Sequence, residues 1–330
     1  MDFVLLLDLS LVLVGLGALW WFGDLVVHYI IEMANVYKVS TFFLGFIVLA
    51  IAADIPELAI AITSALQGAS EVSVGDIIGA NFSDVAMVVG TTLLVAGNKI
   101  TIKRSDATKL LQMIFIATII MLLVFAQGSI DRFTGLVLMG VYFVTITWMW
   151  RKRDRNDILH EEVAALQQDV KEHKDSFLTS RWGLMVKLGI SLVMVMIASC
   201  LTVHYAVAFA TELKIPLETI GATILGIGTS LPELILSLSA LRRKEYALAL
   251  GPTLGTVLQQ TTFILGLLAF CSDKPVRLSG LHWAAYFMFA AFAVVSFGLL
   301  RKKNMGRGVG AVLLVLFVAY MMYQVVPGLA

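Results

Sequence analysis

The stretch GTSLPEL, residues 228–234, places a proline and a carboxylate side by side within a long apolar segment. A bilayer core does not solvate a charged side chain, and a proline inside a helix clashes with the carbonyl four residues earlier. Here that carbonyl belongs to Gly228, just before Glu233. A cation would be a partner for both oxygens where they line a cavity. The stretch therefore predicts an ion-binding break in a membrane helix.

The composition of the whole chain identifies lipid as its solvent. Of its 330 residues, 59% are hydrophobic and 14% are charged, and the mean hydropathy is +0.90. Soluble domains carry roughly a quarter charged residues, so we predict an all-α integral membrane protein in contact with the lipid bilayer. The net charge of +1 gives no reason to expect a nucleic-acid partner. Cys200 and Cys271 match no metal or redox spacing and are expected to be buried small hydrophobic residues.

Ten apolar segments have about the 20 residues that a helix needs to cross a bilayer, so they predict ten transmembrane helices. The segments are 3–33, 41–67, 73–97, 106–127, 131–150, 183–211, 217–241, 246–270, 279–300 and 308–326. The first continues well past the apolar core of a signal peptide, so we expect a spanning helix there. The polar residues 151–182 carry charges of both signs and are expected to form a solvated linker.

Basic residues set the expected orientation in the membrane. They follow the odd-numbered segments, as at Lys103 and Arg104, Arg151 and Arg153, Arg242 and Arg243, and Arg301 and Lys302. Short loops rich in lysine and arginine stay in the cytoplasm. We therefore expect a multi-pass protein of the inner or plasma membrane, with both termini extracytoplasmic and the linker 151–182 cytoplasmic.

The second half of the chain repeats the first. The stretch AADIPEL, residues 52–58, aligns with GTSLPEL at an offset of 176 residues (233 − 57 = 176). The same offset relates Gly45 to Gly221 and Gly79 to Gly255. Each half holds five segments, so the second half must cross the membrane in the opposite sense. The predicted domains are two inverted five-helix repeats, 1–150 and 183–330, joined by the linker. This symmetry is typical of transporters.

The expected ion site draws on both motifs and on the segments that follow them. Asp54 lies three residues before Glu57 and can share its helix face. Asp84 lies one turn beyond Gly79, and its counterpart in the second half is Gln260. The predicted ligands all offer oxygen, and they are Asp54, Glu57, Asp84, Thr229, Ser230, Glu233, Thr256 and Gln260. Such a set suits hard cations, calcium best, and not zinc or copper. No nucleophile or histidine cluster accompanies the carboxylates, so we predict no enzyme, no catalytic residue and no cofactor.

The paired motifs, of the form G-T-S-x-P-E followed by G-N-x-x-G-S-N, resemble those of the calcium/cation antiporter superfamily, and within it the sodium/calcium exchangers. The resemblance extends over essentially the whole chain. It implies exchange of calcium for sodium or protons by alternating access, with ions bound midway across the membrane between the second, third, seventh and eighth helices. It also implies that the first and sixth helices slide as a gate past this rigid core.

The first repeat departs from the motif in its charges. Asp54 stands where serine is expected and Asp76 where asparagine is expected. At the last ligand position the usual amide and acid are exchanged between the repeats, so that the first repeat has Asp84 and the second has Gln260. Asp54, Glu57, Asp84 and Glu233 together would leave two charges unbalanced by one divalent ion, so protons are possible occupants. Sodium coupling, proton coupling and a magnesium or manganese substrate stay open. A second open alternative is a channel or uniporter, which moves ions without counterflow. A third is that the Asp54 side chain points away from the site.

Overall fold

The computed structural model describes residues 3–36, 54–97, 104–151, 181–242, 249–278, 280–301 and 305–325. These ranges leave out most of the predicted linker. They also leave out the first part of the segment predicted at 41–67, which includes Ala52. Every helix of the described part falls on one of the predicted apolar segments. The elements, in which η marks a π-helical turn, are α1 (Phe3–Val36), α3 (Ile55–Leu66), α4 (Ser70–Ser83), η2 (Asp84–Val89), α5 (Gly90–Ala96), α6 (Arg104–Gln127), β1 (Ser129–Ile130), α7 (Arg132–Arg151), α9 (Arg181–Leu213), α10 (Leu217–Ile220), η4 (Gly221–Leu225), α11 (Gly226–Thr229), α12 (Leu231–Arg242), α13 (Gly251–Gln259), η5 (Gln260–Ile264), α14 (Leu265–Cys271), β2 (Val276–Arg277), α15 (His282–Leu300) and α16 (Arg307–Val325).

The helices have the length and composition of membrane spans. Within the described residues, seven are long and apolar enough to cross a bilayer, and three shorter apolar helices accompany them. The membrane class is therefore confirmed, while the ten-helix count stays a prediction. The only departure from an all-helical chain in the described part is a ladder of two residues per strand, in which β1 pairs with β2 antiparallel. It joins the loop after α6 to the loop after α14.

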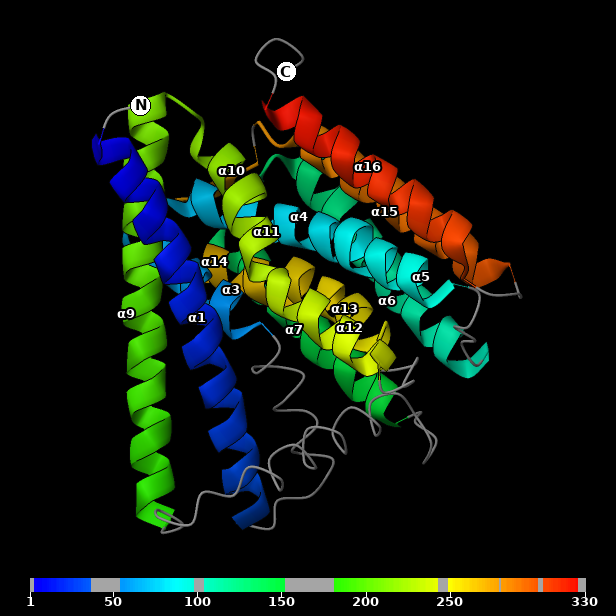
Figure 1. Ribbon diagram of the computed structural model, residues 1–330, viewed down its shortest axis with the longest axis horizontal. Helices are drawn as coiled ribbons and strands as arrows, with labels where there is room; N and C mark the ends of the chain where they lie inside the picture. Colours follow the sequence, from blue (N-terminus) through cyan, green and yellow to red (C-terminus); the bar gives the residue numbers. More distant parts are fainter. Residues whose placement is uncertain are drawn as a thin grey trace.

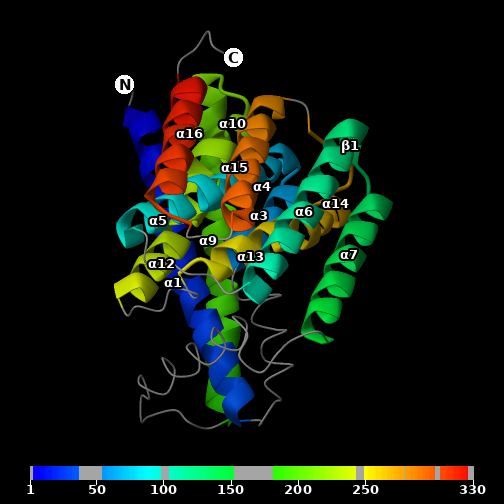
Figure 2. The ribbon, with the colours of Figure 1, turned by 90° about the vertical axis from the view of Figure 1, so that its right-hand side faces the viewer.

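α1 and α9 form a long pair at one side of the molecule (Figure 1). They have 34 and 33 residues, about 50 Å at 1.5 Å per residue, which exceeds the roughly 30 Å of a hydrocarbon core. Seen from the side, both extend beyond the end of the other helices (Figure 2). Their side chains share a hydrophobic cluster with α3 and η4, separate from the cluster that holds α6, α7, α15 and α16 together. The fold thus has a two-helix unit packed against a larger bundle.

The two halves of the chain meet most closely where α4 crosses α10, η4 and α11. A Cβ added at Gly75 would overlap the backbone of Glu218, and one added at Gly79 would overlap that of Ala222. Gly226 in turn faces the backbone of Ala80. These glycines let two helix backbones touch without intervening side chains. At Gly255, the counterpart of Gly79, an added Cβ would meet none of the described atoms within 4 Å.

π-helical turns begin at two positions related by the offset of 176. One is η2, which starts at Asp84, and the other is η5, which starts at Gln260. A π turn holds one residue more than an α turn and often marks a functional site. The two halves therefore share this irregularity at the predicted ligand positions.

The expected burial of the cysteines is wrong. Cys200 is exposed on α9, and Cys271 is half-buried. The outer face of α9 is lined there by Met196, Ile197 and Leu201. In a membrane helix an apolar residue is equally well placed facing lipid, so apolar character alone does not predict burial.

Candidate cation site

Asp54 and Glu57 are placed by the start of a helix. Asp54 immediately precedes α3, whose first turn contains Pro56 and Glu57. Proline is favourable in a first turn, because the N–H that it lacks has no helical partner there. The backbone N–H of Leu58 donates to the carbonyl of Asp54 (2.9 Å). The carboxylate of Glu57 thus lies at the positive end of the helix dipole.

Glu233 is placed by a break in the second motif. α11 ends at Thr229 and α12 begins at Leu231, so that only Ser230 separates two short helices. The backbone N–H of Leu234 donates to the carbonyl of Ser230 (3.2 Å). The proline therefore sits in a new first turn rather than kinking a continuous helix.

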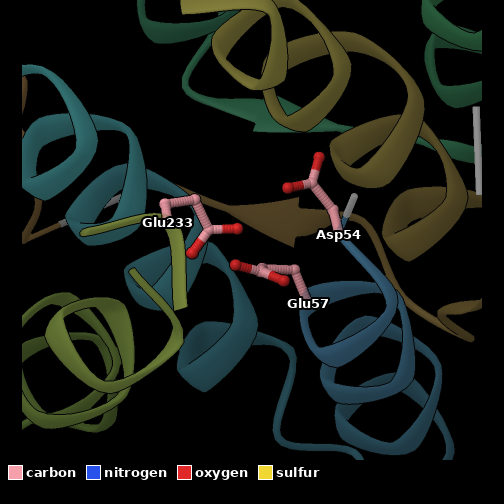
Figure 3. Close-up of side chains that lie close together, drawn as sticks. All are labelled: Asp54, Glu57 and Glu233. Atoms are coloured by element: carbon pink, nitrogen blue, oxygen red, sulfur yellow. The ribbon is translucent and has the colours of Figure 1, made fainter. Parts of the chain in front are cut away.

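Asp54, Glu57 and Glu233 form one group, which we call the central cluster. One oxygen from each lies within 4.8 Å of the others. The carboxylates of Glu57 and Glu233 point toward each other from α3 and α12, with that of Asp54 beside them (Figure 3). Asp54 is 0% exposed and Glu57 is 1% exposed. Such crowding of buried carboxylates is typical of a cation site.

Asp84, Thr256 and Gln260 close one end of the central cluster. The amide of Gln260 donates to Asp54 Oδ1 (3.2 Å) and to Asp84 Oδ2 (3.4 Å). The hydroxyl of Thr256 also donates to Asp84 Oδ2 (3.4 Å). Asp54 therefore faces the site, and the alternative in which it points away is wrong.

Thr229 and Ser230 belong to the second motif, and Thr229 contacts a carboxylate that was not predicted as a ligand. The hydroxyl of Thr229 donates to Oδ1 of Asp76 (3.4 Å), and that of Ser230 donates to the carbonyl of Gly226 (2.9 Å). Asp76 is 0% exposed and lies two turns before Asp84. Its place in an apolar segment, at the motif's asparagine position, was the signal that could have identified it. The structure thus gathers five carboxylates.

Oxygens without hydrogen-bond partners remain around this site. One oxygen of every carboxylate and the amide oxygen of Gln260 are buried and unpartnered: Asp54 Oδ2, Glu57 Oε2, Asp76 Oδ2, Asp84 Oδ1, Glu233 Oε2 and Gln260 Oε1. Among the described residues, the buried polar side chains include no lysine or arginine. An unpartnered buried acceptor is destabilising, and more so when charged. Hard cations such as calcium bind six to eight oxygens of these kinds.

The chain matches known exchangers along most of its length. The family described as sodium/calcium exchanger protein matches residues 7–151 and 183–326. A putative antiporter, CaxA of Alkalimonas amylolytica, is 30% identical over 319 aligned positions, and the alignment covers 94% of this chain and 96% of the relative. The sodium/calcium exchanger MaX1 of Methanosarcina acetivorans is 25% identical over 350 aligned positions, gaps included, and the alignment covers 94% of this chain and 96% of the relative.

Solved exchanger structures share the fold. The H+/Ca2+ exchanger CAX superposes with a TM-score of 0.76 at 17% identity, covering 97% of this chain and 82% of that one. The sodium-calcium exchanger NCX_Mj superposes with a TM-score of 0.59 at 21% identity, covering 96% and 98%. Both are likenesses of fold, at identities too low to carry function.

Proposed function

The chain belongs to the sodium/calcium exchanger protein family, and from this we propose that it is a secondary antiporter that exchanges calcium for sodium, protons or both by alternating access. The observation that carries the proposal is the set of six buried, unpartnered oxygens around the central cluster. A hard divalent cation binds oxygens of these kinds, and one oxygen each from Asp54, Glu57 and Glu233 already lies within 4.8 Å of the others. The relatives CaxA and MaX1 are named as an antiporter and a sodium/calcium exchanger, which supports the same class.

In this proposal calcium binds at the central cluster. Asp54, Glu57 and Glu233 supply charge, and Asp84 and Gln260 supply oxygens at one end. The hydroxyls of Thr229, Ser230 and Thr256 complete the set. Every hydroxyl and amide of this group already touches a carboxylate or a backbone carbonyl of the site. Ser230 and Thr256 also donate to backbone carbonyls at 2.9 Å, and a hydroxyl that donates its hydrogen keeps its oxygen lone pairs for an ion.

The proposed topology has ten transmembrane helices in two inverted repeats, 1–150 and 183–330. The linker 151–182 lies in the cytoplasm, and both termini lie outside it. Two observations support it. The π turns at Asp84 and Gln260 follow the offset of 176, and α1 begins at the same end of the molecule at which α16 ends (Figure 1). Inverted repeats let a transporter exchange inward-open and outward-open states by swapping the conformations of its halves.

α1 and α9 are the proposed gate. Among the described elements they pack most extensively against each other, which supports movement as a unit, and they meet the bundle through the hydrophobic cluster shared with α3 and η4. The close backbone contacts at Gly75 and Gly79 support a bundle that stays fixed around the ions. Alternating access then means that α1 and α9 open the site to one side at a time.

Calcium flux in liposomes tests the proposal. Purified protein is reconstituted with sodium inside, with a proton gradient, or with neither, and uptake of radioactive calcium is followed. An antiporter takes up calcium only when a counter-ion gradient is imposed, and the effective gradient identifies the coupling ion. Equal uptake without any opposing gradient would instead show a channel or uniporter. Competition by magnesium and manganese in the same vesicles identifies the divalent substrate.

A further inference from the structure

Tyr320 reaches from α16 to the segment that leads into the second motif. Its side chain is 0% exposed, and its hydroxyl donates to the backbone carbonyl of Ala222 in η4 (2.9 Å). We propose that Tyr320 is a positioning residue of the cation site, which holds η4 in place and so sets where Thr229 and Glu233 lie. This inference rests on the proposed function, because it takes the oxygens of the second motif as calcium ligands.

The carbonyl that Tyr320 binds belongs to a π turn. In an α-helix the backbone N–H of Gly226 would donate to the carbonyl of Ala222, four residues earlier. In η4 this N–H donates to the carbonyl of Gly221, five residues earlier. The Ala222 carbonyl thereby loses its α-helical donor, and the hydroxyl of Tyr320 takes that place. A buried carbonyl that loses a donor is destabilising, so Tyr320 supports the local geometry of η4.

The same carbonyl lies where η4 crosses α4. A Cβ added at Gly79 would overlap the carbonyl oxygen of Ala222. α4 therefore encloses this oxygen on one side while Tyr320 binds it from α16. The hydroxyl bonds to a backbone atom, so Tyr320 acts through η4 and is not itself a ligand of the site.

α11 follows η4 without a break and lies along α4. A Cβ added at Gly226 would come 2.6 Å from the backbone nitrogen of Ala80, and the hydroxyl of Ser230 lies 3.4 Å from the carbonyl of Ala80. Thr229 is only seven positions after Ala222 (229 − 222 = 7), about 10 Å at 1.5 Å per residue. A displacement of η4 along α4 would therefore move the oxygens of the second motif.

The ring of Tyr320 is itself fixed by aromatic contacts. Its centroid lies 4.6 Å from that of Phe82 and 5.5 Å from that of Phe287, within the range of favourable ring pairs. Phe82 lies two positions before Asp84. One side chain thus contacts the segment that leads to Asp84 and the segment that leads to Thr229, which links the ligands of the two halves.

Tyr320→Phe in the full-length protein tests this inference, because phenylalanine keeps the ring and removes only the hydroxyl. Calcium is titrated calorimetrically into the purified protein in detergent, and calcium flux is measured in liposomes. We expect calcium affinity to fall about three- to tenfold, the effect of one neutral hydrogen bond. KM for calcium should rise by a similar factor, while kcat changes by less than about twofold, as for a lost contribution to binding alone.

Tyr323→Phe is the matched control. Tyr323 lies three positions further along α16, and its buried hydroxyl has no hydrogen-bond partner. Removing that hydroxyl should leave calcium affinity and KM at their wild-type values. Melting temperatures of both variants are measured alongside, since a merely structural role for Tyr320 would lower the melting temperature without changing calcium affinity.

Wild-type calcium affinity and KM in Tyr320→Phe overturn the inference, whether or not the melting temperature falls, while calcium binding to the wild type still supports the proposed function. An equal loss of affinity in Tyr323→Phe also overturns it, because an unpartnered hydroxyl cannot position η4. No calcium binding to the wild type removes the proposed function itself.

Discussion

Gln260 Nε2 lies 3.2 Å from Asp54 Oδ1 and donates a hydrogen bond to it, joining residues 206 positions apart. The same amide group reaches Asp84. One nitrogen therefore holds two carboxylates toward the centre of the site, and Asp54 is fixed beside Glu57 and Glu233. The extra charge of this chain, compared with the serine of the motif it resembles, therefore lies in the central cluster beside Glu57 and Glu233.

Replacing Asp54 by serine should change the coupling ion of transport. The substitution removes one of the charges that a single divalent ion leaves unbalanced, so fewer protons are needed to neutralise the site. We expect calcium flux in liposomes to become less dependent on pH, and sodium gradients to drive it better. Flux is compared at several pH values with sodium present or absent. A mutant with the pH profile and ion preference of the wild type would show that Asp54 does not set the coupling.

Glu57→Gln and Glu233→Gln should each abolish calcium binding. Both variants keep the shape of the side chain and remove one charge from the central cluster. Removing one partner of a buried ionic contact typically costs about 3–5 kcal/mol, so the affinity should fall by about a hundredfold or more. Isothermal titration of calcium into the purified protein measures this fall.

Glu71→Gln is the control for these two variants. Glu71 lies in the first turn of α4, is only partly buried, and lies outside the central cluster. The same loss of charge there should leave calcium affinity within about twofold, as for a surface group. Equal affinity in wild type, Glu57→Gln and Glu233→Gln would place the divalent site elsewhere.

The sequence predicts the helices and the central cluster well, for a physical reason. Spans of apolar residues are long and continuous, and a carboxylate in such a span is costly enough to need a partner. Asp54, Glu57 and Glu233 stand out in this way, and the structure brings them together. Asp84 and Gln260 follow from the offset of 176 and join the same site.

What the sequence could not supply depends on backbone geometry. Pro232 predicts a disturbed helix, but not that the chain divides at Ser230 into two separate helices. Asp76 is as unusual in its apolar segment as Asp84. Its hydrogen-bond partner depends on which residue of α11 lies opposite, and that is Thr229. Such pairings come from how closely two helices pack, which the glycines permit but do not specify.

Gly79→Ala should destabilise the protein, because the new Cβ would overlap the backbone of Ala222. Overpacking a tight contact costs about 1–3 kcal/mol, and backbone atoms cannot move aside as a flexible side chain can. We expect a lower melting temperature in detergent and reduced calcium flux. Gly17→Ala is the control, since a Cβ there meets none of the described atoms within 4 Å. Alanine in that exposed helix position should be neutral or stabilising by up to about 1 kcal/mol.

A disulfide between the proposed gate and the fixed bundle should stop transport. The hydroxyls of Thr63 on α3 and Ser199 on α9 lie 2.7 Å apart, so cysteines at both positions are close enough to pair. If α9 slides past α3 during the cycle, oxidising Thr63→Cys/Ser199→Cys will abolish calcium flux and a reductant will restore it. The background lacks Cys200 and Cys271, so that no other disulfide forms.

A second cysteine pair, placed within the gate, separates sliding from general damage by cross-linking. A Cβ at Gly15 on α1 would touch Thr202 on α9, so Gly15→Cys/Thr202→Cys should also form a disulfide. If α1 and α9 move as one unit, this cross-link leaves their mutual contact unchanged, and flux should persist after oxidation. Flux that persists in the α3–α9 pair, with the disulfide confirmed by mass spectrometry, would rule out sliding at this contact. Flux lost in both pairs would show that α1 and α9 also move relative to each other.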